Sequence, residues 1–130
     1  MSDLLDTDYT ADWLHGAARA APLRPLLAAG QLAISLVTYG EIYEGIYFGR
    51  DPRASQKGFS DFLRSVDVFP LNRRIMQRFA RIRGDLRRSG QLIGDPDLLI
   101  AATALHYHRS LITRNVRHFQ RIAGLQLHQP

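Results

Sequence analysis

The chain has 130 residues, no cysteine and a formal net charge of +5 at pH 7. This length fits one domain covering residues 1–130, and the lack of cysteine excludes disulfide bonds and thiolate metal sites and agrees with a cytoplasmic location. No apolar run approaches the ~20 residues of a membrane span, so we expect no membrane partner.

The positive charge comes almost entirely from arginine. Lysine and arginine total 17, and Lys57 is the only lysine. Because a guanidinium group binds phosphate through two parallel hydrogen bonds, this bias favours a nucleic-acid partner.

Short apolar runs alternate with longer amphipathic segments along the chain. We expect strand 4–5, helix 9–15, helix 22–29, strand 32–34, helix 37–48, helix 52–65, strand 66–69, helix 72–89, helix 95–107, strand 111–112, helix 115–122 and strand 125–127. Strands that alternate with helices predict an α/β fold with a mostly parallel central sheet between helices, an α/β/α sandwich.

The clearest helix is predicted for 72–89, where apolar residues recur at helical spacing. An adjacent face of this helix carries Arg74, Arg78 and Arg81. These arginines either form the solvated face of an amphipathic helix or contact an RNA backbone, and the sequence leaves both interpretations open.

Four acidic or amide residues are expected to converge although they lie far apart in the chain. Asp6 and Asn115 follow predicted strands, and Glu41 and Asp97 lie early in predicted helices. In an open parallel sheet these positions share the edge at which ligands bind. Carboxylates gathered there without thiols indicate a hard cation held by oxygen.

Each acid also has a purely structural interpretation. Asp6 can cap the helix that follows it. Thr38 and Glu41 have the spacing of a capping box, in which the glutamate bonds its own helix N-terminus. Asp97 can be present because its negative charge interacts favourably with the positive end of the helix dipole, while Asp95 serves as the N-cap.

Several ordered segments resemble PIN-domain ribonucleases and, within them, the VapC toxins of bacterial VapBC toxin–antitoxin pairs. The residues that carry the resemblance are Leu4-Leu5-Asp6-Thr7, the Glu41-centred segment 38–45, the segment 97–104 and the segment 111–125. Each piece is weak alone, but their order along nearly the whole chain is specific.

This resemblance implies an Mg²⁺-dependent endoribonuclease, with Mn²⁺ as a possible substitute. Asp6 and Asp97 would be the main metal ligands, Glu41 would complete the cluster directly or through water, and Asn115 would take the fourth catalytic position. The family often has Asn where Asp8 stands, and often Asp or Glu just before the Phe, where His118 stands. Wider PIN domains also carry a fourth acid at or near Asn115. It also implies a homodimer and a VapB-like antitoxin whose C-terminal segment occupies the active groove.

Two other functions are compatible with parts of the sequence. Asp6-Thr7-Asp8-Tyr9-Thr10 fits the Asp-x-Asp-x-Thr motif of haloacid-dehalogenase-like phosphatases, whose downstream lysine would have to be Lys57. A non-catalytic RNA-binding module of PIN-like fold is the other alternative, because Asn115 supplies no charge.

Overall fold

Five short parallel strands form the centre of the molecule. The computed structural model describes residues 2–130, and its strands are β1 (Asp3–Leu5), β2 (Leu32–Ser35), β3 (Val66–Phe69), β4 (Leu111–Ile112) and β5 (Leu127–His128). Their order in the sheet is β3-β2-β1-β4-β5, and every neighbouring pair is parallel. The expected α/β architecture is confirmed, and β3 and β5 are the edge strands.

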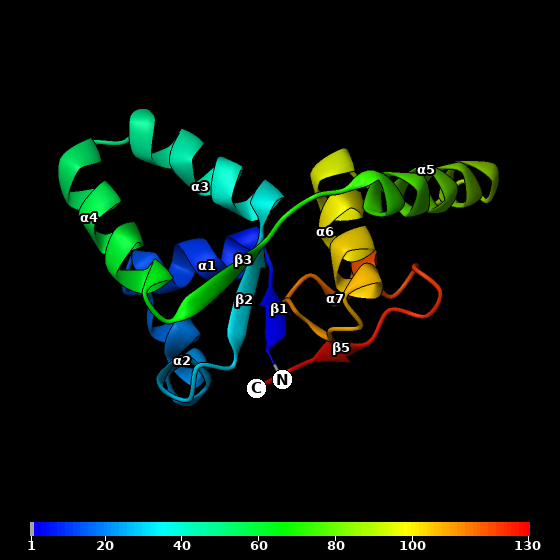
Figure 1. Ribbon diagram of the computed structural model, residues 1–130. Coiled ribbons are helices and arrows are strands. Elements are labelled where there is room, and N and C mark those ends of the chain that lie inside the picture. The colour runs from blue at the N-terminus through cyan, green and yellow to red at the C-terminus, as the bar shows by residue number, and fades with distance from the viewer. Residues whose placement is uncertain (1) are drawn as a thin grey trace.

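Helices cover both faces of this sheet. They are α1 (Thr7–Leu14), the 3₁₀ helix η1 (Ala18–Leu23), α2 (Arg24–Ala28), α3 (Leu36–Tyr47), α4 (Pro52–Leu63), α5 (Arg73–Arg88), α6 (Asp95–His106) and α7 (Val116–Phe119). Helices α1 to α4 lie on one side of the strands and α5 to α7 on the other (Figure 1). No helix within residues 2–130 has the length and apolarity to cross a bilayer.

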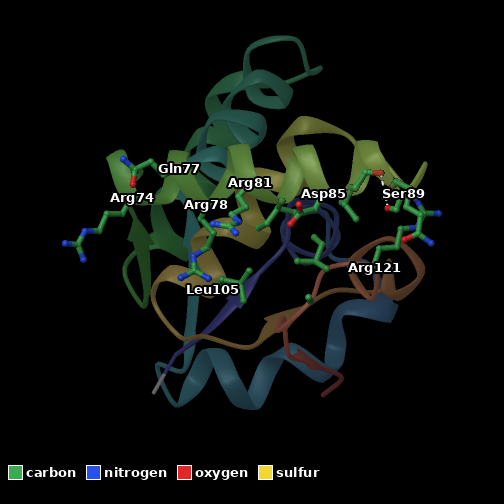
Figure 2. Close-up of a pocket in the computed structure, with 13 residues that line it drawn as sticks. Arg74, Gln77, Arg78, Arg81, Asp85, Ser89, Leu105 and Arg121 are labelled. Atoms are coloured by element: carbon green, nitrogen blue, oxygen red, sulfur yellow. Dashed lines mark hydrogen bonds between the residues drawn. The ribbon is translucent and has the colours of Figure 1, made fainter.

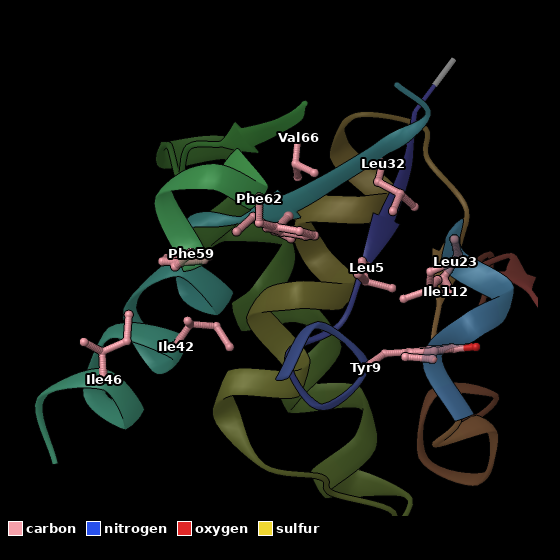
Figure 3. Close-up of a cluster of buried hydrophobic side chains, with 12 residues drawn as sticks. Leu5, Tyr9, Leu23, Leu32, Ile42, Ile46, Phe59, Phe62, Val66 and Ile112 are labelled. Carbon is pink, nitrogen blue, oxygen red and sulfur yellow. The ribbon is translucent and has the colours of Figure 1, made fainter. Parts of the chain in front are cut away.

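The strands divide the hydrophobic core into two layers because successive side chains point to opposite faces of a sheet. Leu5, Ile34 and Ile112 belong to a cluster that includes Phe59 of α4 (Figure 3). Their chain neighbours Leu4, Ala33 and Leu111 belong to a second cluster with α6 and Phe119 of α7. Burial on both faces fixes the register of each strand, and this sets where the strand ends relative to its neighbours in the sheet.

Two predicted elements differ from the structure. The segment 22–29 is not one helix: a 3₁₀ turn precedes α2, and Pro25 lies in the first turn of α2. Proline has no N–H to donate, so a continuous helix through this position would lose a hydrogen bond. The last helix ends at Phe119 because Arg121 and Ile122 donate to residues only three back, which tightens the chain.

The last strand and one helix cap also differ. β5 comprises Leu127 and His128 and not 125–127. Asp95 is not the N-cap of α6, because Gly94 holds that position and the carboxylate of Asp95 accepts a 2.9 Å hydrogen bond from Arg83 Nε. The expected cap is wrong because an arginine on α5 competes for the carboxylate.

Candidate active site

The carboxyl ends of β1, β2 and β4 bring three polar residues to one edge of the sheet. Leu5 pairs with Ile34 on one side and Ile112 on the other, so Asp6, Ser35 and Thr113 follow at the same level. All three are buried. The chain leaves β1 in one direction towards β2 and reaches β4 on the opposite side, and such a switch point is where ligands bind in open α/β sheets.

Asp6 is held by two hydrogen bonds. Its Oδ1 accepts from the backbone N–H of Tyr9 at 3.0 Å, and its Oδ2 accepts from the hydroxyl of Thr113 at 2.5 Å. Burial raises the pKa of Asp6 to about 6 although both hydrogen bonds act in the opposite direction, and the negative charges of Asp8 and Asp97 raise it further. Asp6 therefore caps α1, as its structural interpretation predicted, and also faces other carboxylates.

Asp97 lies in the first turn of α6, close to this carboxylate. Burial raises its pKa, the charge of His118 lowers it, and the charge of Asp8 raises it. His118 Nδ1 lies 4.0 Å from Asp97 Oδ2 and 2.9 Å from Asn115 Nδ2. The structure thus brings Asp6, Asp8 and Asp97 together and places Asn115 beside the histidine that neighbours Asp97.

Glu41 is exposed and lies across from the start of α1. The hydroxyl of Thr7 donates to Glu41 Oε1 at 2.6 Å and lies 3.0 Å from the hydroxyl of buried Thr38. The capping-box interpretation of Glu41 is wrong, because Ser35 is the N-cap of α3 and accepts from the N–H of Thr38. Glu41 lies in the second turn of that helix, where its backbone needs no cap.

The donor set is compatible with a hard cation. Within residues 2–130, no three His, Asp or Glu side chains are arranged closely enough to hold a metal ion by themselves. Mg²⁺ keeps several of its waters and commonly takes only one or two carboxylates. Asp97 and Asp8 lie close enough for their charges to raise the pKa of Asp6, and this arrangement fits that type of site.

Sequence reasoning missed Thr113 and Asp12. Thr113 donates to Asp6 and accepts from the N–H of Asn115 at 2.9 Å, so it links three parts of the site. Its position directly after a predicted strand, like that of Asp6, was the available signal. Asp12 is buried on α1 and pairs with Arg114, the residue after Thr113, and with Arg19.

Comparison with known proteins identifies the family. The PIN domain family model matches residues 4–125. The chain belongs to the PIN-domain family. Ribonuclease VapC1 of Haemophilus influenzae (strain R2866) is 34% identical to this PIN domain over 101 residues, which cover 78% of the chain and 75% of the relative. The tRNA(fMet)-specific endonuclease VapC of Shigella flexneri is 27% identical over 123 residues, covering 95% and 93%.

Solved structures agree with this assignment. The PIN domain superposes on a chain of VapBC2 from Rickettsia felis, bound to a promoter DNA fragment, with a TM-score of 0.89 and 25% identity, covering 100% of this chain and 99% of that one. A haloacid-dehalogenase-like phosphatase is therefore excluded. Lys57, the lysine that such a phosphatase would need, pairs with Asp61 on the surface of α4.

Proposed function

We propose that this PIN domain, residues 1–130, is a VapC-like toxin: a divalent-metal-dependent endoribonuclease that acts on RNA in the cytoplasm. The observation that carries the proposal is the position of Asp6 at the switch point of the sheet, with Asp97 and Asp8 close enough for their charges to raise its pKa. Such a group of carboxylates in a basic protein is suited to a cation and an anionic substrate. The ribonuclease names of the relatives support the same activity.

Asp6 and Asp97 would hold Mg²⁺ or Mn²⁺, with Glu41 contributing directly or through water. When bound, such an ion activates water and offsets charge on a phosphodiester. The protein's own part is to fix these oxygens: Thr113 and the N–H of Tyr9 lock the Asp6 carboxylate in one orientation.

Asn115 takes the fourth catalytic position by acting on its neighbour. Its amide nitrogen lies within hydrogen-bond distance of His118 Nδ1, which orients the imidazole beside Asp97. Asn115 itself supplies no charge, in contrast to the acid that wider PIN domains carry at or near this position. Attack of water on phosphorus with departure of the 3′ oxygen then leaves 5′-phosphate and 3′-hydroxyl ends.

A VapB-like antitoxin is the proposed inhibitor, and a groove beside Glu41 is its proposed binding surface. This groove of about 420 Å³ lies between α1, α3 and α4, and its apolar wall includes Leu14, Ile42 and Ile46. An amphipathic segment could place its apolar side there and a basic side chain near the carboxylates. At the end of α3, Tyr47 and Phe48 are 66% and 87% exposed and are candidates for protein contacts, including those of the expected homodimer.

The test is cleavage of total RNA by the purified chain in Mg²⁺, in Mn²⁺ and in EDTA. We expect cuts with either metal and none in EDTA, with 5′-phosphate and 3′-hydroxyl ends. Asp97→Asn should abolish cleavage. Asp95→Asn is the matched control, because Asp95 lies two residues away in the same turn and pairs with Arg83 on the surface.

Two outcomes would contradict the proposal. Cleavage that persists in EDTA or in Asp97→Asn would remove the metal or the residue from the reaction. Binding of RNA without any cleavage, after denaturation and refolding to strip bound antitoxin, would favour the non-catalytic RNA-binding module.

A further inference from the structure

A long basic groove follows helix α5. It has a volume of about 900 Å³ and is bordered by α5, by the end of α6 at Leu105 and by the segment after α7. Arg74, Arg78 and Arg81 line it from α5, and Arg121 lines it from the opposite border (Figure 2). We call this hollow the α5 groove.

The sequence explains why these arginines share one groove. Residues 74, 78 and 81 are spaced by four and three, so they lie on one face of the helix. At 1.5 Å per residue they span about 10 Å along the α5 axis. The apolar residues of the same helix turn towards α6, and Ile82 and Leu86 form part of the floor of the groove.

Arg74, Arg78 and Arg81 form no ion pair with an acidic side chain in the part of the chain that the structure describes. Among residues 2–130, the arginines that form ion pairs are Arg19, Arg83 and Arg114, and none of these lines the α5 groove. Asp85 is the one acidic residue among those that border it. Four guanidinium groups against one carboxylate leave a surplus of three positive charges.

An anionic strand is the occupant that matches this charge. A second copy of the chain is disfavoured, because a two-fold interface here would place positive charge against positive charge. Guanidinium groups bind phosphate oxygens in pairs of hydrogen bonds, and a positively charged groove that follows the backbone is typical of proteins that bind single-stranded nucleic acid.

The α5 groove is also placed to reach the carboxylate site. Helices α5 and α6 run antiparallel, since Asn72 contacts His106 at one end and Arg83 pairs with Asp95 at the other. Leu105 is the residue of α6 that lines the groove, and it lies eight residues, or about 12 Å along the helix axis, from Asp97. The groove and Asp97 thus share helix α6, and only RNA that extends beyond the carboxylate site could occupy both.

We propose that the α5 groove binds the phosphodiester backbone of the RNA substrate, outside the nucleotides at which the strand is cut. This inference rests on the proposed ribonuclease function and adds a substrate-binding surface to it. Long RNA reaches the groove and is bound there by Arg74, Arg78, Arg81 and Arg121. RNA that is too short to extend beyond the carboxylate site does not contact these arginines.

The test measures RNA binding separately from cleavage. All proteins carry Asp97→Asn so that RNA stays intact. Fluorescence anisotropy reports binding of labelled polyuridylate and, separately, of labelled polyglutamate at several salt concentrations. The groove variant combines Arg74→Gln, Arg78→Gln and Arg81→Gln. The control variant combines Arg73→Gln, Arg87→Gln and Arg88→Gln, which removes the same charge from the same helix outside the groove.

We expect the groove variant to bind about tenfold more weakly or worse, with the slope of log K against log salt reduced in size by about 2, since each lost phosphate contact removes about 0.7. The control variant should change binding less than the groove variant. Glutamine and arginine have similar helix propensities, so both variants should fold, and circular dichroism and melting temperature check this.

Three results would overturn the proposal. The groove variant could bind polyuridylate like its parent. The two variants could lose binding equally, which would show an effect of overall charge. The groove variant could lose binding to polyglutamate but not to polyuridylate, which would assign the groove to an acidic protein segment. If polyuridylate binding depends on the groove but the unsubstituted chain cuts no RNA, the groove stands and the proposed nuclease function fails.

Discussion

Replacing Asp6 with asparagine should stabilise the metal-free protein while abolishing its activity. The native carboxylate is 5% exposed, and its pKa is about 6 against an ordinary value of 3.8. A shift of this size corresponds to about 3 kcal/mol at 1.36 kcal/mol per pH unit, lost when the buried group ionises. Asparagine is neutral at every pH and avoids that cost.

The gain is smaller than the full cost of the charge because asparagine has one oxygen where aspartate has two. Either the N–H of Tyr9 or the hydroxyl of Thr113 loses its acceptor or must rearrange. One such hydrogen bond is worth about 1 kcal/mol. At pH values above the pKa of the native Asp6, we therefore expect Asp6→Asn to raise the free energy of unfolding by about 2 kcal/mol.

The sign of the pH dependence follows from the raised pKa. Between the unfolded and folded pKa values the folded protein binds more protons than the unfolded chain, so native stability falls as pH rises from about 4 to about 6 and then levels off. At about pH 4 the native Asp6 is neutral, and the asparagine variant loses its advantage.

Urea denaturation of both proteins in EDTA, at about pH 4 and about pH 7.5, measures this difference. Taking the difference between the two proteins cancels other titrating groups, including Asp97. An asparagine variant that is less stable at the higher pH, or a difference that does not change with pH, would refute the reasoning.

Three further changes test the site and its support. Millimolar Mg²⁺ or Mn²⁺ should raise the melting temperature, because a cation relieves the repulsion between Asp6 and Asp97; a thermal-shift assay in which Asp97→Asn responds equally would count against it. Thr113→Val removes a hydrogen bond that lowers the pKa of Asp6, so the rise of the cleavage rate on the acid side of its pH profile should move to higher pH. A pH–rate profile that does not move would contradict this. Asp12→Ala leaves Arg114 without its carboxylate partner, so urea denaturation should show a free energy of unfolding lower by about 2 kcal/mol. An unchanged free energy would show that the ion pair does not stabilise the fold.

Much of the site followed from local sequence because its residues lie at ends of regular elements. Asp6 comes directly after an apolar run that forms β1, and Asp97 lies one residue beyond a proline suited to the first turn of a helix. Such positions fix where a residue lies relative to the sheet edge. They do not fix its partners: Thr113 contacts Asp6 across 107 positions of chain, and only the register of β1 with β4 brings the two together.

Glu41 and Asp95 show where local patterns mislead. Thr38 and Glu41 have the spacing of a capping box, but Ser35 begins the helix three residues earlier, so the pattern falls in the wrong turn. Asp95 has the residue type of an N-cap, but Arg83 on another helix takes its carboxylate. In the first case an earlier residue caps the helix, and in the second an arginine from another helix binds the carboxylate.

The ends of the described chain lie side by side, at the opposite end of the sheet from the carboxylates (Figure 1). Asp3 in β1 and His128 in β5 are joined there at 2.5 Å between Oδ2 and Nδ1. An affinity tag or surface linker at either end would therefore point away from the nuclease edge and leave it open to RNA. The same closeness makes the chain a candidate for circular permutation, with new ends opened in the exposed turn between α3 and α4.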